Sequence, residues 1–256
     1  MAESTPPRRR LVGTSLKMYF DLAQTQSYIT SVSKLGALAQ KHNIDLFVVP
    51  DFISLLPSHE ILKSTPVLLG AQDTYTQARG AFTGEVSPLN LSQAGVKIVE
   101  IGHAERRRLF GETDKDVGEK CAAVVEHGMV PLVCIGEKSH GSIASAAVGM
   151  AVEECRVQVQ AVLDAVPDGA EVVLAYEPVW AIGAKQPAPP DHVVNVVREL
   201  RRMVEGRKGL TRILYGGSAG PGTFETLKEG VDGLFLGRFA HDVANLEKVI
   251  MEMSNP

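Results

Sequence analysis

The sequence predicts an α/β fold, a single closed barrel of eight parallel β-strands that alternate with α-helices. Eight short β-rich runs recur along the 256-residue chain. Most of them are continuously apolar, as strands buried on both faces of a parallel sheet are. The stretches between them have the spacing of amphipathic helices. About 250 residues is also the usual size of one such barrel.

The eight runs mark where we expect strands. They cover residues 10–17, 45–49, 67–72, 98–102, 130–136, 171–177, 212–217 and 233–237. Helical spacing is clearest in two of the intervening stretches. Val117, Cys121 and Val124 share one apolar face, and the apolar residues between positions 192 and 203 recur close to every 3.6 residues.

Such alternation also fits an open, doubly wound sheet, and the first strand-to-helix turn decides between the two. A dinucleotide-binding sheet carries GxGxxG at that turn, whereas this chain has LKMYFD at residues 16–21. No long Gly-, Pro- or Ser-rich linker and no shift in composition divides the chain. We therefore expect one barrel domain over residues 10–256, preceded by a flexible tail at residues 1–9.

Charge and composition argue against several kinds of partner. The net charge is −4 and the pI is near 6, which gives no electrostatic reason to expect nucleic acid or a membrane surface. No apolar segment has the length of a membrane span, and none follows the N-terminus as in a signal peptide. The three cysteines are odd in number and lack metal-site spacing. We therefore expect reduced thiols in a cytoplasmic protein.

In a barrel the active site lies at the carboxyl ends of the strands, so the polar residues that follow each apolar run are candidates. These residues are Lys17, Gln72, Asp73, His103, Glu105, Glu137, Glu177, Ser218 and Arg238. Any one of them alone would more often be a structural or solvated residue. A lysine, a histidine and several glutamates on one rim, however, can perform acid–base chemistry.

The last two strand ends indicate a phosphate site. YGGSAG (215–220) and FLGRFA (235–240) place small residues where backbone N–H groups can approach a ligand closely. Barrels of this type often bind phosphate between strands 7 and 8, and Arg238 could pair with that anion. The alternative is that these glycines only form tight turns and that Arg238 points away.

Four motifs resemble the triosephosphate isomerase family, the family of the TIM barrel, over nearly the whole chain, from Leu11 to Val249. They are GAQDTYTQARGAFTGE (70–85), IGHAERRRLFGETD (101–114), AYEPVWAIG (175–183) and LYGGS (214–218). The resemblance implies an intramolecular aldose–ketose isomerase of a phosphorylated sugar that needs no cofactor and no metal. The first motif is similar to the loop through which the family forms homodimers, and Thr83 at its tip would support the partner's site.

The resemblance also implies roles for individual residues. Glu177 would be the base that moves a proton between two carbons, His103 the electrophile, and Lys17 the electrostatic partner of the substrate oxygens. Glu105 would orient the site from beside His103. The other substrate contacts that we expect, mostly to phosphate, are Ser15, Gly183, Gly216, Gly217, Ser218, Gly237 and Arg238.

The sequence departs from the family pattern at two positions near the substrate. The family has an asparagine where this chain has Ser15, and a second glycine where it has Arg238. A serine is shorter and would leave room, while Arg238 would be strained if its φ had to be positive. The two departures together resemble the branch of the family that isomerises four-carbon erythrulose phosphates.

Several functions therefore stay open. The first is the triosephosphate isomerase reaction of glycolysis and gluconeogenesis, which interconverts D-glyceraldehyde 3-phosphate and dihydroxyacetone phosphate through an enediolate. The second is the conversion between L-erythrulose 1-phosphate and D-erythrulose 4-phosphate. The third is an inactive, phosphate-binding paralogue. The fourth is another phosphate-binding barrel, such as a lyase or synthase, which would not need the motifs around His103 and Glu177.

Overall fold

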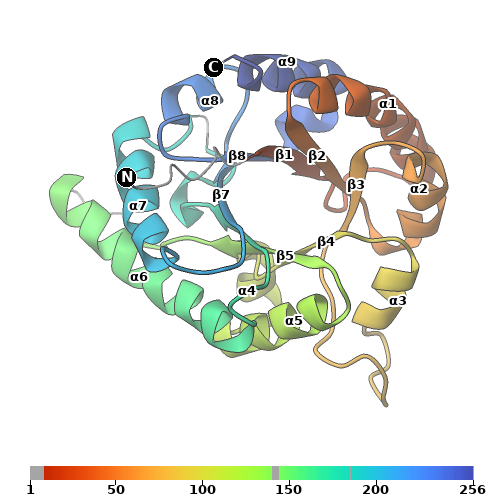
Figure 1. Ribbon diagram of the computed structural model, residues 1–256, viewed down its shortest axis with the longest axis horizontal. Coiled ribbons are helices and arrows are strands. Elements are labelled where there is room, and N and C mark those ends of the chain that lie inside the picture. The colour runs from red at the N-terminus through yellow and green to blue at the C-terminus, as the bar shows by residue number, and fades with distance from the viewer. Residues whose placement is uncertain (1–8, 140–143, 185, 256) are drawn as a thin grey trace.

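The computed structural model of the chain describes residues 9–139, 144–184 and 186–255. Its eight parallel strands follow one another around a closed barrel in chain order, and β8 pairs with β1 (Figure 1). The predicted fold class is therefore confirmed. The predicted tail, apart from residue 9, lies outside the described residues and stays a prediction.

The strands and helices alternate around the barrel. The strands are β1 Arg10–Ser15, β2 Ile44–Val49, β3 Val67–Ala71, β4 Ile98–Ile101, β5 Val130–Ile135, β6 Val172–Tyr176, β7 Thr211–Gly217 and β8 Gly233–Leu236. The helices are α1 Leu22–Lys41, α2 Leu55–Leu62, α3 Pro88–Gln93, α4 Ala104–Phe110, α5 Asp114–Glu126, α6 Ala144–Ala165, α7 Pro190–Met203, α8 Thr223–Leu227 and α9 Val243–Met253. Three short 3-10 turns are η1 Phe52–Ser54, η2 Val179–Ala181 and η3 Arg238–His241.

All eight predicted strands are present, although their ends differ from the prediction by a few residues. The first strand shows the physical reason for such a difference. The prediction ran to Lys17, but β1 ends at Ser15. Lys17 has a φ of 49°, in the left-handed region, so the backbone leaves the sheet at this point. The turn places Lys17 beside the cavity described below instead of in the strand ladder.

The two stretches with clear helical spacing are helices. The Val117 to Val124 face lies in α5, which begins with a capping box formed by Thr113 and Asp116. The apolar positions of the later stretch lie in α7, where Val193, Val197 and Leu200 are buried. In the described part of the chain, no helix combines the length and the apolar character that crossing a membrane would require.

The barrel interior is filled by side chains that point inward from successive strands. They form one apolar cluster, made up of Leu11, Phe47, Val49, Ile98, Leu132, Cys134, Val173, Ala175, Leu214 and Phe235. A larger cluster fills the layer between the strands and the surrounding helices. At the amino-terminal rim, buried Arg212 pairs with Asp45 at 2.6 Å and with Glu171 at 2.5 Å. Packing and ion pairs therefore close this end of the barrel.

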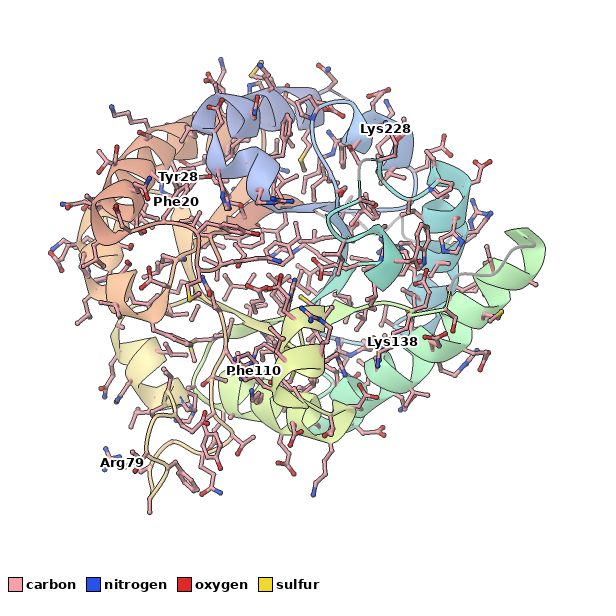
Figure 2. The ribbon with its side chains drawn as sticks, turned by 180° about the vertical axis from the view of Figure 1, so that it is seen from behind. Phe20, Tyr28, Arg79, Phe110, Lys138 and Lys228 are labelled. Atoms are coloured by element: carbon pink, nitrogen blue, oxygen red, sulfur yellow. The ribbon has the colours of Figure 1, made fainter. Side chains whose placement is uncertain are left out.

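The segment between β3 and α3 extends away from the barrel (Figure 1). Arg79 lies close to its outer end (Figure 2). Within the segment, the rings of Tyr75 and Phe82 are 4.5 Å apart, and Thr83 is exposed. The predicted dimer loop is therefore a protruding arm.

Candidate active site

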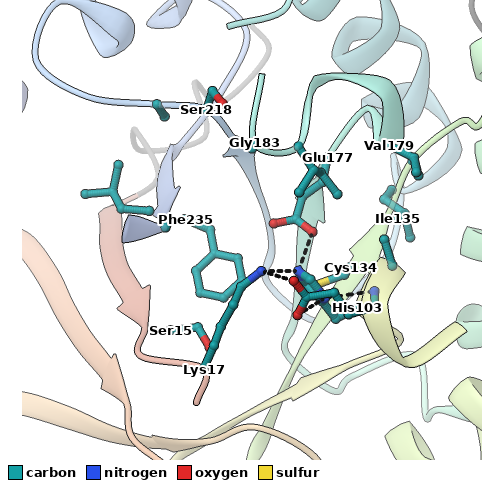
Figure 3. A pocket seen from close by; sticks show the side chains of 18 of the residues that line it. Ser15, Lys17, His103, Cys134, Ile135, Glu177, Val179, Gly183, Ser218 and Phe235 are labelled. Carbon is teal, nitrogen blue, oxygen red and sulfur yellow. Dashed lines mark hydrogen bonds and ion pairs between the residues drawn. The ribbon is translucent and has the colours of Figure 1, made fainter. Parts of the chain in front are cut away.

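A cavity of about 1350 Å³ opens at the carboxyl ends of the strands. Lys17, His103 and Glu177 line it, each from the segment that follows its strand (Figure 3). The other predicted site residues that line it are Ser15, Glu105, Gly183, Gly217, Ser218, Gly237 and Arg238. Thr83, on the protruding arm, and Gly216, beside Glu177, are not among the lining residues.

His103 is oriented as a hydrogen-bond donor to the cavity. It is the N-cap of α4, and its Nδ1 accepts the backbone N–H of Glu105 at 3.1 Å. A neutral imidazole has one N–H, so the proton lies on Nε2. Nε2 is 3.4 Å from Lys17 Nζ and 3.6 Å from Glu177 Oε2. The cap therefore fixes both the tautomer and the direction of the donor.

Lys17 is held in place by Glu105, whose Oε1 accepts from Nζ at 2.8 Å. Burial lowers the pKa of Lys17, but the hydrogen bond to Glu105 and the charges of Glu105, Glu177 and Glu100 outweigh it and raise the pKa above its usual value. Since Lys17 Nζ and His103 Nε2 are both donors, they do not bond to each other. They adjoin one space, in which an anionic oxygen can accept from both.

Glu177 follows β6 and is 6% exposed. Within the described residues, its buried Oε2 has no hydrogen-bond partner. Two glycines make this position possible. A Cβ on Gly216 would lie 2.4 Å from Cγ and Oε1 of Glu177, and a Cβ on Gly136 would lie 1.9 Å from its carbonyl oxygen. The unpaired oxygen is thus available to take a proton from a bound molecule.

The expected phosphate contacts lie on the loops that follow β6, β7 and β8 and, for Gly216 and Gly217, at the end of β7 itself. Gly183 and Gly217 have φ values of 72° and 104°, which explains why both are glycine. The Ser218 hydroxyl donates to the carbonyl of Ala184 at 2.7 Å. It therefore joins the loop after β7 to the segment that follows η2.

Arg238 occupies its position without backbone strain. Among the described non-glycine residues, positive φ occurs at Lys17 and Asn43, and the preceding Gly237 has φ −94°. The condition for strain at Arg238 is therefore not met. The exposed guanidinium lies 5.8 Å from the centroid of the Tyr19 ring, at the edge of the cavity.

Three of the rim candidates have structural partners instead of facing the cavity. Gln72 donates to the Lys17 carbonyl at 2.8 Å and so supports the turn after β1. Asp73 pairs with Lys120 and with Arg106, at 2.8 Å each, in a buried ion cluster.

In residues 9–139, 144–184 and 186–255, no three His, Cys, Asp or Glu side chains gather as metal ligands. The expectation of a reaction without metal or cofactor stays a prediction.

Glu137 is the third of these candidates, and it anchors the segment that follows Glu177. It is fully buried, and its Oε1 accepts from Trp180 Nε1 at 2.8 Å and lies 3.1 Å from His192 Nε2. Its backbone carbonyl accepts from Val179 at 3.0 Å. These contacts hold η2, the start of the segment that carries Gly183.

Sequence reasoning misses Glu100, the third residue of β4. It is 3% exposed, and its Oε2 accepts from the Ser15 hydroxyl at 2.8 Å. Burial, with a smaller contribution from the charge of Glu177, raises the pKa of Glu100 to about 7. His103, the Ser15 hydrogen bond and Lys17 oppose this rise. The signal that could identify Glu100 is a charged residue in the middle of an otherwise apolar strand.

The family model described as triosephosphate isomerase matches residues 10–253. The chain belongs to this family. An L-erythrulose-1-phosphate isomerase of Pectobacterium atrosepticum is 42% identical over 96% of each chain. An L-erythrulose-1-phosphate isomerase of Rhizobium meliloti is 40% identical over 95% of this chain and 96% of the relative. A triosephosphate isomerase of Aquifex aeolicus is 35% identical over 94% of this chain and 98% of the relative. The resemblance is confirmed, and the chain is a sugar-phosphate isomerase.

Proposed function

We propose that the chain interconverts L-erythrulose 1-phosphate and D-erythrulose 4-phosphate, with Glu177 as the base. One arrangement carries the chemistry. The unpaired Oε2 of Glu177 lies 3.6 Å from the donor Nε2 of His103, which is 3.4 Å from Lys17 Nζ. A base beside one donor, with a second donor next to the first, supports proton transfer between adjacent carbons of a bound hydroxy ketone.

The reaction needs no net change in oxidation state of the substrate. Glu177 takes the proton from C3 of L-erythrulose 1-phosphate, and the electrons of that C–H bond form a C2–C3 double bond. The C2 oxygen gains negative charge and accepts hydrogen bonds from His103 and Lys17. A proton moves from the C3 oxygen to the C2 oxygen, and Glu177 returns its proton to C2. The carbonyl then lies at C3.

The product, numbered from its other end, is D-erythrulose 4-phosphate. Both compounds are ketoses, so the proposed reaction is a ketose–ketose isomerisation, which differs from the aldose–ketose type expected from the resemblance. The proton transfer chemistry of Glu177 is the same in the two cases.

Two observations support the four-carbon substrate. The relatives described as L-erythrulose-1-phosphate isomerases are 42% and 40% identical to this chain, compared with 35% for the triosephosphate isomerase. Ser15, one of the two departures from the family pattern, lines the cavity and is 3% exposed. A cavity of about 1350 Å³ holds either sugar, so the lining residues must select between them.

The test is a comparison of kcat/KM for the two substrate pairs with the same purified protein. We expect at least a tenfold preference for the erythrulose phosphates, since differences in binding of about 1.4 kcal/mol give tenfold discrimination. A Glu177→Gln preparation, purified in parallel, measures any host isomerase that copurifies. A preference for the triose phosphates would overturn the proposed substrate.

The triosephosphate isomerase reaction is the second candidate. The relative from Aquifex aeolicus supports it, as do the intact motifs that carry His103 and Glu177. The same assay tests it. An inactive paralogue would turn over neither pair, and replacing Glu177 by Asp, which withdraws the carboxylate from the substrate, would then change nothing.

We also propose that the chain forms a homodimer through the loop at residues 70–85, most of which lies in the protruding arm between β3 and α3. We propose further that the phosphate binds near Gly183, Ser218, Gly237 and Arg238. The exposed arm and the positive backbone φ at Gly183 support these assignments. Light scattering coupled to size-exclusion chromatography gives the mass in solution. A mass near 27.5 kDa at micromolar concentration would contradict the dimer.

A further inference from the structure

A hydrogen bond crosses the barrel beneath the active site. Ser15 ends β1, Glu100 lies on β4, and two strands separate them around the sheet. The Ser15 hydroxyl nevertheless donates to Glu100 Oε2 at 2.8 Å, with both residues 3% exposed. Ser15 lines the cavity and Glu100 does not, so the carboxylate supports the serine from below.

This bond fixes what Ser15 can offer to a ligand. A serine hydroxyl has one proton to donate and two lone pairs that accept. A carboxylate can only accept, so the single proton of Ser15 points to Glu100. The lone pairs of Ser15 Oγ stay available to the cavity, and the negative charge below makes this oxygen a better acceptor. An asparagine amide at position 15 could instead donate.

We propose that Glu100 holds the Ser15 hydroxyl as a hydrogen-bond acceptor for the terminal C4 hydroxyl of L-erythrulose 1-phosphate. Glu100 is thus a positioning residue, and the pair selects the substrate by hydrogen bonding in addition to the room that a short side chain leaves. This inference rests on the proposed four-carbon substrate. Neither side chain takes part in the proton transfer at C3 and C2.

The position of Ser15 in the cavity fits this role. Figure 3 shows Ser218 and Gly183 at one end of the cavity and Ser15 at the other, with Glu177 between them. In L-erythrulose 1-phosphate, the phosphate is on C1 and the additional hydroxymethyl group is on C3, the carbon from which Glu177 takes the proton. A substrate with its phosphate near Ser218 therefore directs its C4 hydroxyl toward Ser15.

The charges around Glu100 set the pH at which it holds Ser15 in this way. Four titratable groups in the described part of the chain surround Glu100. His103 follows β4, the strand of Glu100; Lys17 follows β1; Glu177 follows β6; and the Cys134 thiol lies on neighbouring β5. Burial raises the pKa of Glu100 to about 7, with Glu177 adding to the rise and His103, the Ser15 bond and Lys17 opposing it. Below that pH a protonated Glu100 can donate to Ser15, which frees the serine proton to point into the cavity.

The experiment removes the C4 hydroxyl from the substrate and the carboxylate from the protein, separately and together. Wild type, Glu100→Leu, which removes the acceptor of the Ser15 proton, Ser15→Ala and the double variant are assayed with L-erythrulose 1-phosphate and with its 4-deoxy analogue. We expect wild type to prefer the hydroxylated substrate by about tenfold in kcat/KM, the usual effect of one hydrogen bond. Each variant should lose this preference, and the double variant should lose nothing more.

The measured quantity is a ratio, so a general loss of activity or of folded protein does not alter it. Turnover of the 4-deoxy analogue reports the folded, active fraction in each preparation. Glu171→Leu, at the opposite rim, is the matched control for loss of one carboxylate and should keep the wild-type ratio. In wild type the preference should also be smaller at pH 6 than at pH 8.5, a change that a merely structural role of Glu100 would not produce.

The possible outcomes separate the inference from the proposed function. If Glu100→Leu keeps the wild-type preference for the C4 hydroxyl, the role of Glu100 is wrong, whatever Ser15→Ala does. If Ser15→Ala also keeps it, the hydroxyl binds elsewhere. If wild type turns over only triose phosphates, the proposed substrate is wrong and this inference is wrong with it.

Discussion

The two rims of the barrel use charged residues in opposite ways. At the amino-terminal rim, buried Arg212 is paired with both Asp45 and Glu171. At the carboxyl-terminal rim, Glu177 keeps a buried oxygen without a hydrogen-bond partner in the described residues, and the donor Nε2 of His103 lies 3.6 Å from it. Paired charges stabilise a fold, whereas unpaired buried groups cost stability and stay available to a ligand. Substitutions at the two rims should therefore separate stability from activity.

The largest effect is expected for Glu177→Gln. The amide keeps the shape of the side chain but cannot take a proton, so kcat should fall by about a thousandfold. The free energy of unfolding, measured by urea denaturation, should stay equal or rise, because the substitution removes a buried carboxylate oxygen that has no hydrogen-bond partner among the described residues. A variant that kept wild-type kcat would show that another group is the base.

The next effect concerns the pH dependence of stability, and it comes from Glu100. Its pKa is raised from 4.5 to about 7 by burial, so the native state keeps a proton that the unfolded state has lost between these values. The stability that this proton contributes is present below pH 4.5 and is lost as the pH rises through 7. Between pH 5 and pH 8, wild type should lose about 3 kcal/mol more than Glu100→Gln. Parallel pH dependences in urea titrations would contradict the raised pKa.

A smaller effect, on stability alone, is expected at the amino-terminal rim. Arg212→Met keeps the apolar stem but leaves Glu171 without this partner and leaves Asp45 with Arg9 alone, whose Nε lies 2.7 Å from Oδ1. Since both carboxylates are partly exposed, the loss should be about 2 kcal/mol, less than for a fully buried pair. Thermal and urea unfolding measure this loss, and kcat at 25 °C should not change. A tenfold fall in kcat would mean that the rims are coupled.

The smallest effect is expected for Glu105→Gln, which weakens the partner of Lys17 without moving the base. Burial raises the pKa of Glu105, but the Lys17 hydrogen bond and charge outweigh this and lower the pKa below its usual value, so the carboxylate is ionised at neutral pH. Without that charge, Lys17 is positioned less firmly, and kcat/KM should fall about tenfold. Glu60→Gln, an exposed change elsewhere, is the control. Unchanged kinetics in Glu105→Gln would show that the backbone alone positions Lys17.

The fold and the position of three residues that line the cavity could be predicted from local signals. A continuously apolar run specifies a strand buried on both faces, and the residue that follows it lies at the catalytic rim. Lys17, His103 and Glu177 each follow such a run. Their motifs extend over neighbouring residues, so each could be recognised without knowledge of the others.

The supporting contacts could not be predicted in the same way. Glu100 lies inside a strand run, and alternation shows only that it shares the inward face with Ile98. Its partner, Ser15, precedes it by 85 positions. Which inward residues meet across a barrel depends on the tilt and stagger of all eight strands, which the pattern of a single strand does not contain.

Gly216 limits the scaffolds into which this site could be moved. A Cβ at this position would overlap with Cγ and Oε1 of Glu177, so these atoms occupy the space that a side chain here would fill. The position of the Glu177 side chain, just after β6, thus depends on the absence of a Cβ at one residue of neighbouring β7. A graft that copied Lys17, His103 and Glu177 onto a barrel with alanine at the matching position would reproduce the reacting groups and still displace the carboxylate. A version of this site that can be moved to another barrel must therefore include a glycine at the position that corresponds to Gly216 in the neighbouring strand.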